Sequence, residues 1–362
     1  MHIVIDARII HSSTGRYVER LLHYLQQIDT INSYTVLIPS KDTDYWKPSA
    51  SNFSVKVADY KNYSFGEQIG FKKLLDSLNA DLVHFCMPQQ PILYNGATVT
   101  TFHDLTLFDT YNSDKNWFVF HAKQLIGRFV FTAAARKSRH IITPTEYVRS
   151  DVSKRLGVNK DKIITTYEAA DITTEEPQPY RLPFKEFILY VGQQSDYKNI
   201  KRLGDAHQKL LATHPNLGLV LVGSKNASAI KNEAYFTEND YTNILFTGFV
   251  DDNQLAWLFK NCQVYAFPSL MEGFGLPGLE AMCYGAPVAS SNATCLPEVY
   301  GDAAHYFNPI ESTDIARAIE DILSDQVYRE QLIANGYERA QHYSWKRMAE
   351  QTHAIYISSI KK

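Results

Sequence analysis

Residues 267–288 of this 362-residue chain read FPSLMEGFGLPGLEAMCYGAPV, and this stretch joins a strand to a helix through a glycine-rich loop. A strand is expected to end at Pro268 and a helix to begin near Leu276, because proline suits the first turn of a helix. That turn presents unpaired N–H groups and the positive end of the helix dipole, which suit a diphosphate. Gly273 and Gly275 let the backbone approach such a ligand closely.

Glu272 and Glu280 lie on either side of this loop and helix start. They are eight residues apart, which we interpret as Glu280 lying about two helical turns deeper. Two carboxylates beside a phosphate-binding loop suit the recognition of hydroxyl groups, one on a transferred sugar and one on a ribose. For an isolated G-x-G pattern, solvated glutamates and a simple turn explain the residues equally well, so the rest of the chain has to decide.

Short apolar runs rich in Val and Ile recur along the chain and alternate with helical patterns. Such runs are typical of strands that helices cover on both faces, so the alternation predicts an α/β fold with parallel sheets. The expected strands are 3–5, 34–38, 54–58, 82–85, 98–102, 140–143 and 162–166 in the first half, and 187–191, 218–222, 244–246, 264–267, 288–290 and 305–307 in the second.

A domain boundary is expected in residues 171–183, where three prolines and several polar residues exclude a helix or a central strand. It separates two Rossmann-like domains, 1–172 and 173–344, each with its own doubly wound sheet. If the two domains face each other, the carboxyl ends of both sheets surround one interdomain cleft, where ligands bind.

The segment from Glu272 through Phe274-Gly275-Leu276-Pro277 to Glu280 resembles the E-x7-E signature of the retaining family 4 glycosyltransferases, mannosyltransferases among them. That family has the GT-B architecture of two facing Rossmann-like domains. Further segments resemble family landmarks, namely Ile5–Arg8 with Thr14–Tyr17, Thr101–Leu105, Tyr190–Asn199, Cys295–Val299 and Asn308-Pro309. The segment Tyr343–Trp345 and the helix 345–362 resemble the family's return onto the first domain. The likeness covers nearly the whole chain.

The resemblance implies a role for each expected site residue. Lys198 pairs with the donor phosphates, Glu272 binds hydroxyls of the transferred sugar, and His103 contacts the sugar near the reacting carbon. We take these three as the catalytic set. Glu280 binds the ribose. The remaining donor-binding residues, which contact the diphosphate or the base mainly through the backbone, are Gly15, Gln193, Val250, Phe274, Gly275 and Leu276.

Two departures from the family pattern concern the phosphates. Gln193 stands where relatives often carry a phosphate-binding arginine, and the first glycine loop, around Gly15, has one glycine fewer. The loss of one cation is expected to weaken stabilisation of the departing nucleotide by a few kcal/mol, on the order of one lost transition-state contact. Arg202 and Arg16 are candidate substitutes.

The function implied by the resemblance is the transfer of a hexose from a nucleotide diphosphate sugar to a glycan or a lipid-linked acceptor, with retention of configuration. GDP-mannose is favoured as the donor over UDP- and dTDP-sugars. No metal or other cofactor is expected, because Lys198 and the helix start at Leu276 are suited to the charge on the leaving group. We interpret the sequence Asp42-Thr-Asp44, which is similar to a metal-binding motif of other glycosyltransferases, as a chance match.

Two alternative functions are considered. A nicotinamide oxidoreductase is one, because Gly273-x-Gly275-x-x-Gly278 matches the dinucleotide fingerprint. The next expected strand does not end in an acid, which argues against it. The other is a catalytically weak subunit that binds a sugar nucleotide, a reading that Gln193 favours.

Composition excludes some partners and compartments. The net charge of −3 offers no basic field for nucleic acid. No apolar stretch approaches the roughly 20 residues of a membrane span, and no secretory signal is expected. The four cysteines form no C-x-x-C pair, so we expect reduced thiols and a cytoplasmic protein.

The run Lys115–His140 has two interpretations. It contains six Lys or Arg, no acid and several aromatic residues. A helix of this kind suits peripheral contact with the inner face of an anionic membrane, or contact with a lipid-linked acceptor. It equally suits a long core helix whose cations reach the surface.

Overall fold

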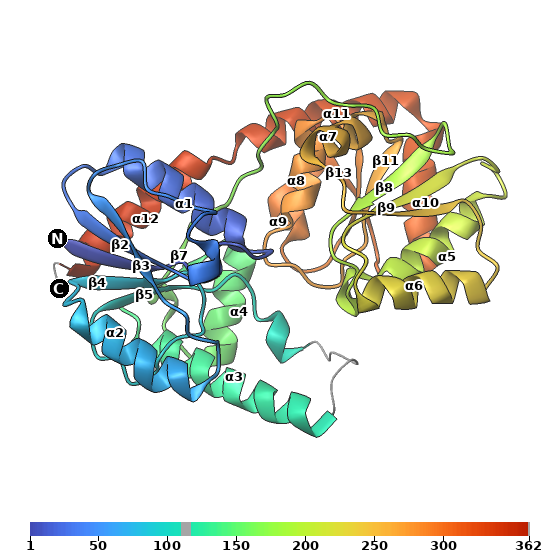
Figure 1. Ribbon diagram of the computed structural model, residues 1–362. Coiled ribbons are helices and arrows are strands. Elements are labelled where there is room, and N and C mark those ends of the chain that lie inside the picture. Colours follow the sequence, from blue (N-terminus) through green and yellow to red (C-terminus); the bar gives the residue numbers. More distant parts are fainter. Residues whose placement is uncertain (110–116, 361–362) are drawn as a thin grey trace. The chain divides into compact units, whose positions relative to one another are not determined.

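The computed structural model describes residues 1–109 and 117–360, and the chain in it divides into two units (Figure 1). The first, here called the N-unit, comprises Met1–Glu168 and Ser344–Lys362. The second, the C-unit, comprises Ala169–Tyr343. Each unit contains one parallel β-sheet with helices on both of its faces.

Within the described residues, the N-unit sheet has seven parallel strands in the order β3-β2-β1-β4-β5-β6-β7. The strands are β1 His2–Asp6, β2 Ser33–Ile38, β3 Phe53–Val57, β4 Leu82–Phe85, β5 Thr98–Thr101, β6 His140–Thr143 and β7 Ile163–Thr165. The chain order reverses beside β1, which pairs with both β2 and β4. Side chains of Ile3, Val4 and Ile5 in β1 are fully buried, as their apolar sequence predicts for a central strand.

The C-unit repeats this arrangement, with six described strands in the order β10-β9-β8-β11-β12-β13, all parallel. They are β8 Phe187–Val191, β9 Gly218–Val222, β10 Ile244–Gly248, β11 Val264–Phe267, β12 Val288–Ser291 and β13 Ala304–Phe307. The reversal here falls between β8 and β11. In both units every strand expected from the sequence is confirmed, with ends shifted by at most two residues.

Helices cover both faces of each sheet (Figure 1). In the N-unit, α1 Gly15–Ile28 and α12 Trp345–Ile360 pack together on one face, and α2 Lys72–Ser77, α3 Trp117–Lys137 and α4 Glu146–Leu156 lie on the other. In the C-unit, α5 Ile200–Leu210, α6 Ala227–Glu238 and α10 Ser312–Ser324 lie on one face, and α7 Asp252–Asn261, α8 Leu276–Cys283, α9 Leu296–Tyr300 and α11 Gln326–Gln341 on the other.

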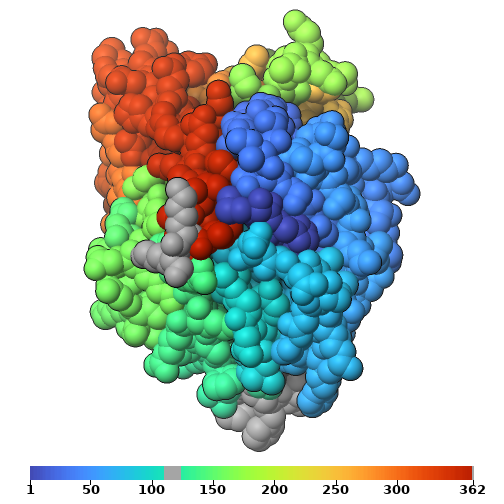
Figure 2. Space-filling view, turned by 90° about the vertical axis from the view of Figure 1, so that its left-hand side faces the viewer, coloured from blue at the N-terminus to red at the C-terminus, as the bar shows by residue number. Residues whose placement is uncertain are grey.

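The C-terminal helix α12 is integrated into the N-unit through polar contacts inside the protein. Tyr356 Oη lies 2.6 Å from Nδ1 of the buried His84 in β4, and His353 Nε2 lies 2.9 Å from the Asp29 carboxylate. The space-filling view shows this helix, in red, at the surface beside the N-terminal end of the chain, in dark blue (Figure 2). No helix in the described parts of the chain is both long and apolar enough to cross a membrane.

Candidate active site

Lys198 and Glu272 meet at the reversal point of the C-unit sheet. Lys198 ends a short 3-10 turn, Asp196–Lys198, that follows β8, and Glu272 lies in the loop between β11 and α8. Nζ of Lys198 donates to Oε1 of Glu272 at 2.6 Å, and the two side chains are 13% and 12% exposed. In parallel α/β sheets the crevice outside such a reversal point is the usual ligand site. The sequence placed both residues in the site but did not predict their pairing.

The loop that carries Lys198 is fastened to the loop that carries Glu272. Asn199 adopts the left-handed conformation (φ +64°), which asparagine tolerates better than most residues. Its Nδ2 donates to the carbonyls of Pro268 (3.1 Å) and Pro309 (2.6 Å). The backbone N–H of Leu270 donates to the carbonyl of Tyr197 at 2.8 Å. These bonds fix the position of the lysine loop relative to the glutamate loop.

The start of α8 requires glycine for two reasons. Gly275, which precedes the helix, has φ +93°, a conformation that side chains disfavour. A Cβ atom there would also lie 2.6 Å from the hydroxyl of Tyr300, which itself donates to the Gly275 carbonyl at 2.5 Å. Pro277 occupies the first turn of α8, as expected. The backbone N–H groups of the first turn of α8 come directly after Phe274 and Gly275 in the chain, and both of these residues are buried.

The depth expected for Glu280 was wrong. The interval from Glu272 to Glu280 is not helical throughout, because α8 begins only at Leu276. Glu280 is therefore four residues into the helix, just over one turn from its start. Its side chain is half-buried.

The other expected donor-binding positions of the C-unit follow neighbouring strands. Gln193, after β8, is exposed, and its carbonyl accepts from Tyr190 Oη at 2.6 Å. Val250, after β10, is buried. Arg202, a candidate replacement for the missing phosphate-binding arginine, lies in the first turn of α5 and donates to Asn199 Oδ1 at 2.8 Å. Arg202 is thus adjacent to the lysine loop, whereas the other candidate, Arg16, belongs to the N-unit.

His103 lies at the carboxyl end of the N-unit sheet, just after β5. Its Nε2 donates to the carbonyl of Cys86 at 3.1 Å, and its Nδ1 lies 3.2 Å from Oε1 of Glu168. Since a carbonyl only accepts, Nε2 is the nitrogen that donates in the bond to Cys86. The ring of Tyr17 lies edge-on at 4.8 Å. Sequence reasoning missed Glu168, although an acid just after an expected strand, 162–166, could have indicated it.

Gly15 begins α1 in a position that only glycine fits. A Cβ atom on Gly15 would lie 1.8 Å from the carbonyl oxygen of Ile10, closer than any real contact. The loop after β1 therefore folds tightly against the first turn of α1, with Gly15 buried.

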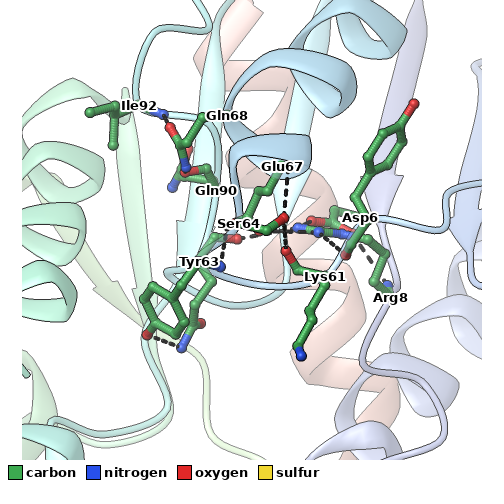
Figure 3. Close-up of polar contacts among 11 residues, drawn as sticks. Asp6, Arg8, Lys61, Tyr63, Ser64, Glu67, Gln68, Gln90 and Ile92 are labelled. Atoms are coloured by element: carbon green, nitrogen blue, oxygen red, sulfur yellow. Dashed lines mark hydrogen bonds and ion pairs between the residues drawn. The ribbon is translucent and has the colours of Figure 1, made fainter. Parts of the chain in front are cut away.

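The reversal point of the N-unit holds a buried charge network, shown in Figure 3. Arg8 donates through Nε and Nη2 to both oxygens of Asp6 at 2.8 Å, and through Nη1 to Glu67 Oε1 at 3.1 Å. Its remaining contacts are the carbonyls of Tyr60 (3.0 Å) and Gln89 (3.4 Å). The five N–H groups of the guanidinium thus each have an acceptor. The side chains of Asp6 and Glu67 are 0% exposed and that of Arg8 is 3% exposed.

This network joins the ends of β1 and β4 to a π-helix, Gly66–Phe71. Burial raises the pKa of Glu67, while Arg8 and the N–H of Tyr63 favour its charged form. The guanidinium also stacks 4.0 Å above the ring of Phe71. Because every N–H group of the Arg8 guanidinium donates to an acceptor within the protein, we interpret the network as structural.

In residues 1–109 and 117–360, no three side chains of His, Cys, Asp or Glu are close enough together to hold a metal ion. All four cysteines are free thiols, as expected.

Comparison with known proteins identifies the family. Residues 14–174 match the model described as Glycosyltransferase Family 4, and residues 158–339 match the model described as Glycosyl transferases group 1. The O-antigen chain mannosyltransferase B of Escherichia coli is 31% identical over 268 residues, which are 70% of this chain and 68% of that protein. This chain belongs to glycosyltransferase family 4.

A second relative of this family 4 chain is longer. The serotype-specific mannosyltransferase WbdA of Escherichia coli is 31% identical over 265 residues, which are 70% of this chain but only 32% of that protein. Among solved structures, sucrose-phosphate synthase from Thermosynechococcus elongatus superposes with a TM-score of 0.78 at 18% identity, covering 99% of this chain and 98% of that one. These likenesses confirm the expected GT-B fold of two Rossmann-like domains.

Family membership also bears on the oxidoreductase alternative. The dinucleotide-like glycines Gly273, Gly275 and Gly278 lie inside the matched glycosyltransferase region 158–339. They form the start of α8 beside Glu272 and are part of a glycosyltransferase domain. The roles of individual site residues, including Lys198 and Glu272, stay predictions.

Proposed function

We propose that this family 4 glycosyltransferase transfers mannose from GDP-mannose to a growing glycan or a lipid-linked acceptor, with retention of configuration and without a divalent metal. The observation that carries the proposal is the Lys198–Glu272 ion pair beside the start of α8. The choice of sugar is supported by the relatives, which are mannosyltransferases by name.

The ion pair suits a site that exchanges partners when the donor binds. A nucleotide sugar offers phosphate oxygens to Lys198 and sugar hydroxyls to Glu272, so each member of the pair finds a replacement in the ligand. Lysine suits this exchange because its ammonium is a compact charge on a flexible stem. The N–H groups of Gly275 and Leu276 add the positive end of the α8 dipole for the diphosphate.

In the proposed reaction, the bond between the anomeric carbon and the phosphate oxygen breaks and its electron pair stays on the phosphate. The acceptor hydroxyl attacks the same face of the sugar, and its proton passes to the departing phosphate oxygen. Charge builds on the phosphate in the transition state, where Lys198 and the α8 N-terminus stabilise it most. His103, held by Cys86 and Glu168, contacts the sugar near the reacting carbon.

The remaining contacts concern the nucleotide. Glu280 binds the ribose, and the backbone of Val250 meets the base. Phe274, Gln193 and Gly15 border the diphosphate. Arg202 supplies the second cation that Gln193 does not.

A transfer assay tests the proposal. Purified protein is incubated with radiolabelled GDP-mannose and a lipid-linked or soluble mannose acceptor, with UDP-glucose and dTDP-glucose in parallel and with EDTA in one series. We expect an α-linked mannosyl product, unaffected by EDTA, and a loss of at least 100-fold in the Glu272→Gln variant, as for removal of a transition-state contact. Tight binding of the nucleotide sugar without transfer would instead favour the catalytically weak subunit.

The proposal includes peripheral contact with an anionic membrane at its cytoplasmic face, through α3. Leu125, Ile126 and Phe129 on this helix are 67%, 52% and 63% exposed, and Arg128 lies between them. On the opposite side of the helix, Phe131 and Ala134 are buried in the core. An exposed apolar strip with a cation beside it supports interfacial binding. Of the run Lys115–His140, residues 115 and 116 lie outside the described residues.

A further inference from the structure

Two adjacent residues hold both backbone groups of Glu272. The hydroxyl of Thr294 accepts the N–H of Glu272 at 3.1 Å. The thiol of Cys295 donates to the carbonyl of Glu272 at 3.3 Å. Thr294 and Cys295 lie in the loop between β12 and α9, 22 and 23 residues further along the chain. The peptide groups on either side of the Glu272 side chain are therefore fixed by one loop.

The backbone of Thr294 is in an uncommon conformation. Its φ is +55°, a left-handed value that is rare for a β-branched residue. Such conformations persist where the surroundings determine them, and they concentrate at functional sites. Here the left-handed turn directs the hydroxyl to the glutamate loop, and the N–H of Ala293 donates to Ser291 Oγ at 3.1 Å, which holds the preceding turn.

Cys295 suits the donor role. Its side chain is fully buried, and burial, with the nearby Glu272 charge, raises the pKa of the thiol well above its ordinary value. The thiol therefore keeps its proton at neutral pH and can donate. The helix that begins directly after Cys295 is itself fixed to the α8 start, through the bond from Tyr300 to the Gly275 carbonyl.

We propose that Thr294 is a positioning residue that fixes Glu272 for the transferred sugar, with Cys295 as its partner. This inference rests on the proposed function. When Lys198 turns to the donor phosphates, the ion pair no longer orients the carboxylate. The two backbone bonds then determine where the carboxylate lies, since Glu272 is in a loop. A shift of about 1 Å in such a group can lower turnover about 100-fold.

The experiment compares Thr294→Val, which keeps the β-branched shape but removes the hydroxyl, with Thr294→Ser, which keeps the hydroxyl. Calorimetry measures the binding of a nucleotide sugar and of the matching nucleoside diphosphate. These are GDP-mannose and GDP, or UDP-glucose and UDP if the wild-type protein binds the uridine ligands instead. We expect Thr294→Val to weaken nucleotide-sugar binding or lower kcat by at least 10-fold, and to leave nucleoside diphosphate binding unchanged. Thr294→Ser should restore most of the loss. Unchanged diphosphate binding also shows that the variant is folded.

Controls separate this inference from the function on which it rests. Thr237→Val makes the same chemical change on the exposed side of α6 and should behave as wild type. Added to Glu272→Gln, Thr294→Val should cause no further loss. If Glu272→Gln is inactive while Thr294→Val equals wild type, the positioning role is overturned and the proposed function stands. If Glu272→Gln keeps full activity, the assigned sugar site is wrong; if wild type transfers no sugar, the proposed function itself fails.

Discussion

Each of the two sheets places a group of charged side chains at an equivalent point, and the two groups differ in the exposure of these side chains. In the N-unit, Asp6, Arg8 and Glu67 lie where β1 meets β4, with side chains at most 3% exposed. In the C-unit, Lys198 and Glu272 lie where β8 meets β11, at 13% and 12% exposure. Both groups occupy the edge where parallel sheets usually bind ligands.

The difference shows that the position in the sheet does not by itself make a binding site. The N–H groups of the planar Arg8 guanidinium all donate to carboxylates and carbonyls of its own unit. None of these donors remains available to a ligand. Lys198 forms a compact pair with Glu272 that water still reaches. We therefore expect the first network to support stability and the second to support turnover.

The largest expected effect is on turnover at the C-unit pair. Lys198→Met should lower kcat about 1000-fold, equivalent to about 4 kcal/mol, because the charge on the departing phosphate loses its cation. Steady-state kinetics with the active donor measures this. Lys201→Met, an exposed lysine on α5, is the matched control and should keep wild-type kcat. A loss below 10-fold at Lys198 would contradict the expectation that this ion pair supports turnover.

Substitution in the buried Arg8 network should lower stability and leave turnover nearly unchanged. Arg8→Met leaves the carboxylates of Asp6 and Glu67 buried without their cation, so the free energy of unfolding should fall by about 3 kcal/mol. Urea denaturation measures the loss, and kcat per folded molecule should stay near wild type. Lys72→Met breaks a surface pair with Asp76 at 2.6 Å and should cost less than about 1 kcal/mol. Equal losses in both variants would argue against a structural role for Arg8.

Acid should destabilise both units, since each holds a buried neutral histidine. Burial lowers the pKa of His84 in the N-unit to about 3 and that of His207 in the C-unit to about 4. Both stay neutral in the folded protein, whereas unfolded histidines gain a proton below about pH 6.5. Their contribution is therefore present above pH 6.5 and is lost as the pH falls toward 4.

The expected loss at pH 4.5 is on the order of 2 kcal/mol for each histidine, measured as urea unfolding at pH 7 and pH 4.5. His207→Gln should reduce the pH dependence in the C-unit, followed by hydrogen exchange, and leave that of the N-unit unchanged. A pH dependence unaltered by this substitution would show that His207 does not titrate as inferred.

The smallest expected effect concerns the surface. Replacing Ile126 and Phe129 by Ser should lower sedimentation with anionic liposomes several-fold, because less apolar area enters the interface. Val327→Ser, which changes an exposed apolar residue on α11 of the C-unit, should have no effect. Binding that is equal on neutral and anionic liposomes would contradict the electrostatic part of the proposal.

Much of the fold could be predicted from local patterns. The strands, the proline-led start of α8 and the glycine at its N-terminus follow from residues that are neighbours in sequence. The depth of Glu280 was misjudged because all eight residues after Glu272 were counted as helical, although the sequence itself predicts that the helix begins near Leu276. Glu168 and Thr294 were missed, since their contacts join segments 65 and 22 residues apart.

The sequence by itself determined the α/β class, the two sheets and the family, because apolar periodicity and short motifs act within a few residues of the chain. Only the tertiary structure decided which charges are saturated and which remain accessible. Lys198 and Glu272 are 74 residues apart, and their pairing depends on adjacent parallel strands that bring two loops to the same edge. Burial, which separates the Arg8 network from this pair, is a property of the packed protein and not of any single segment.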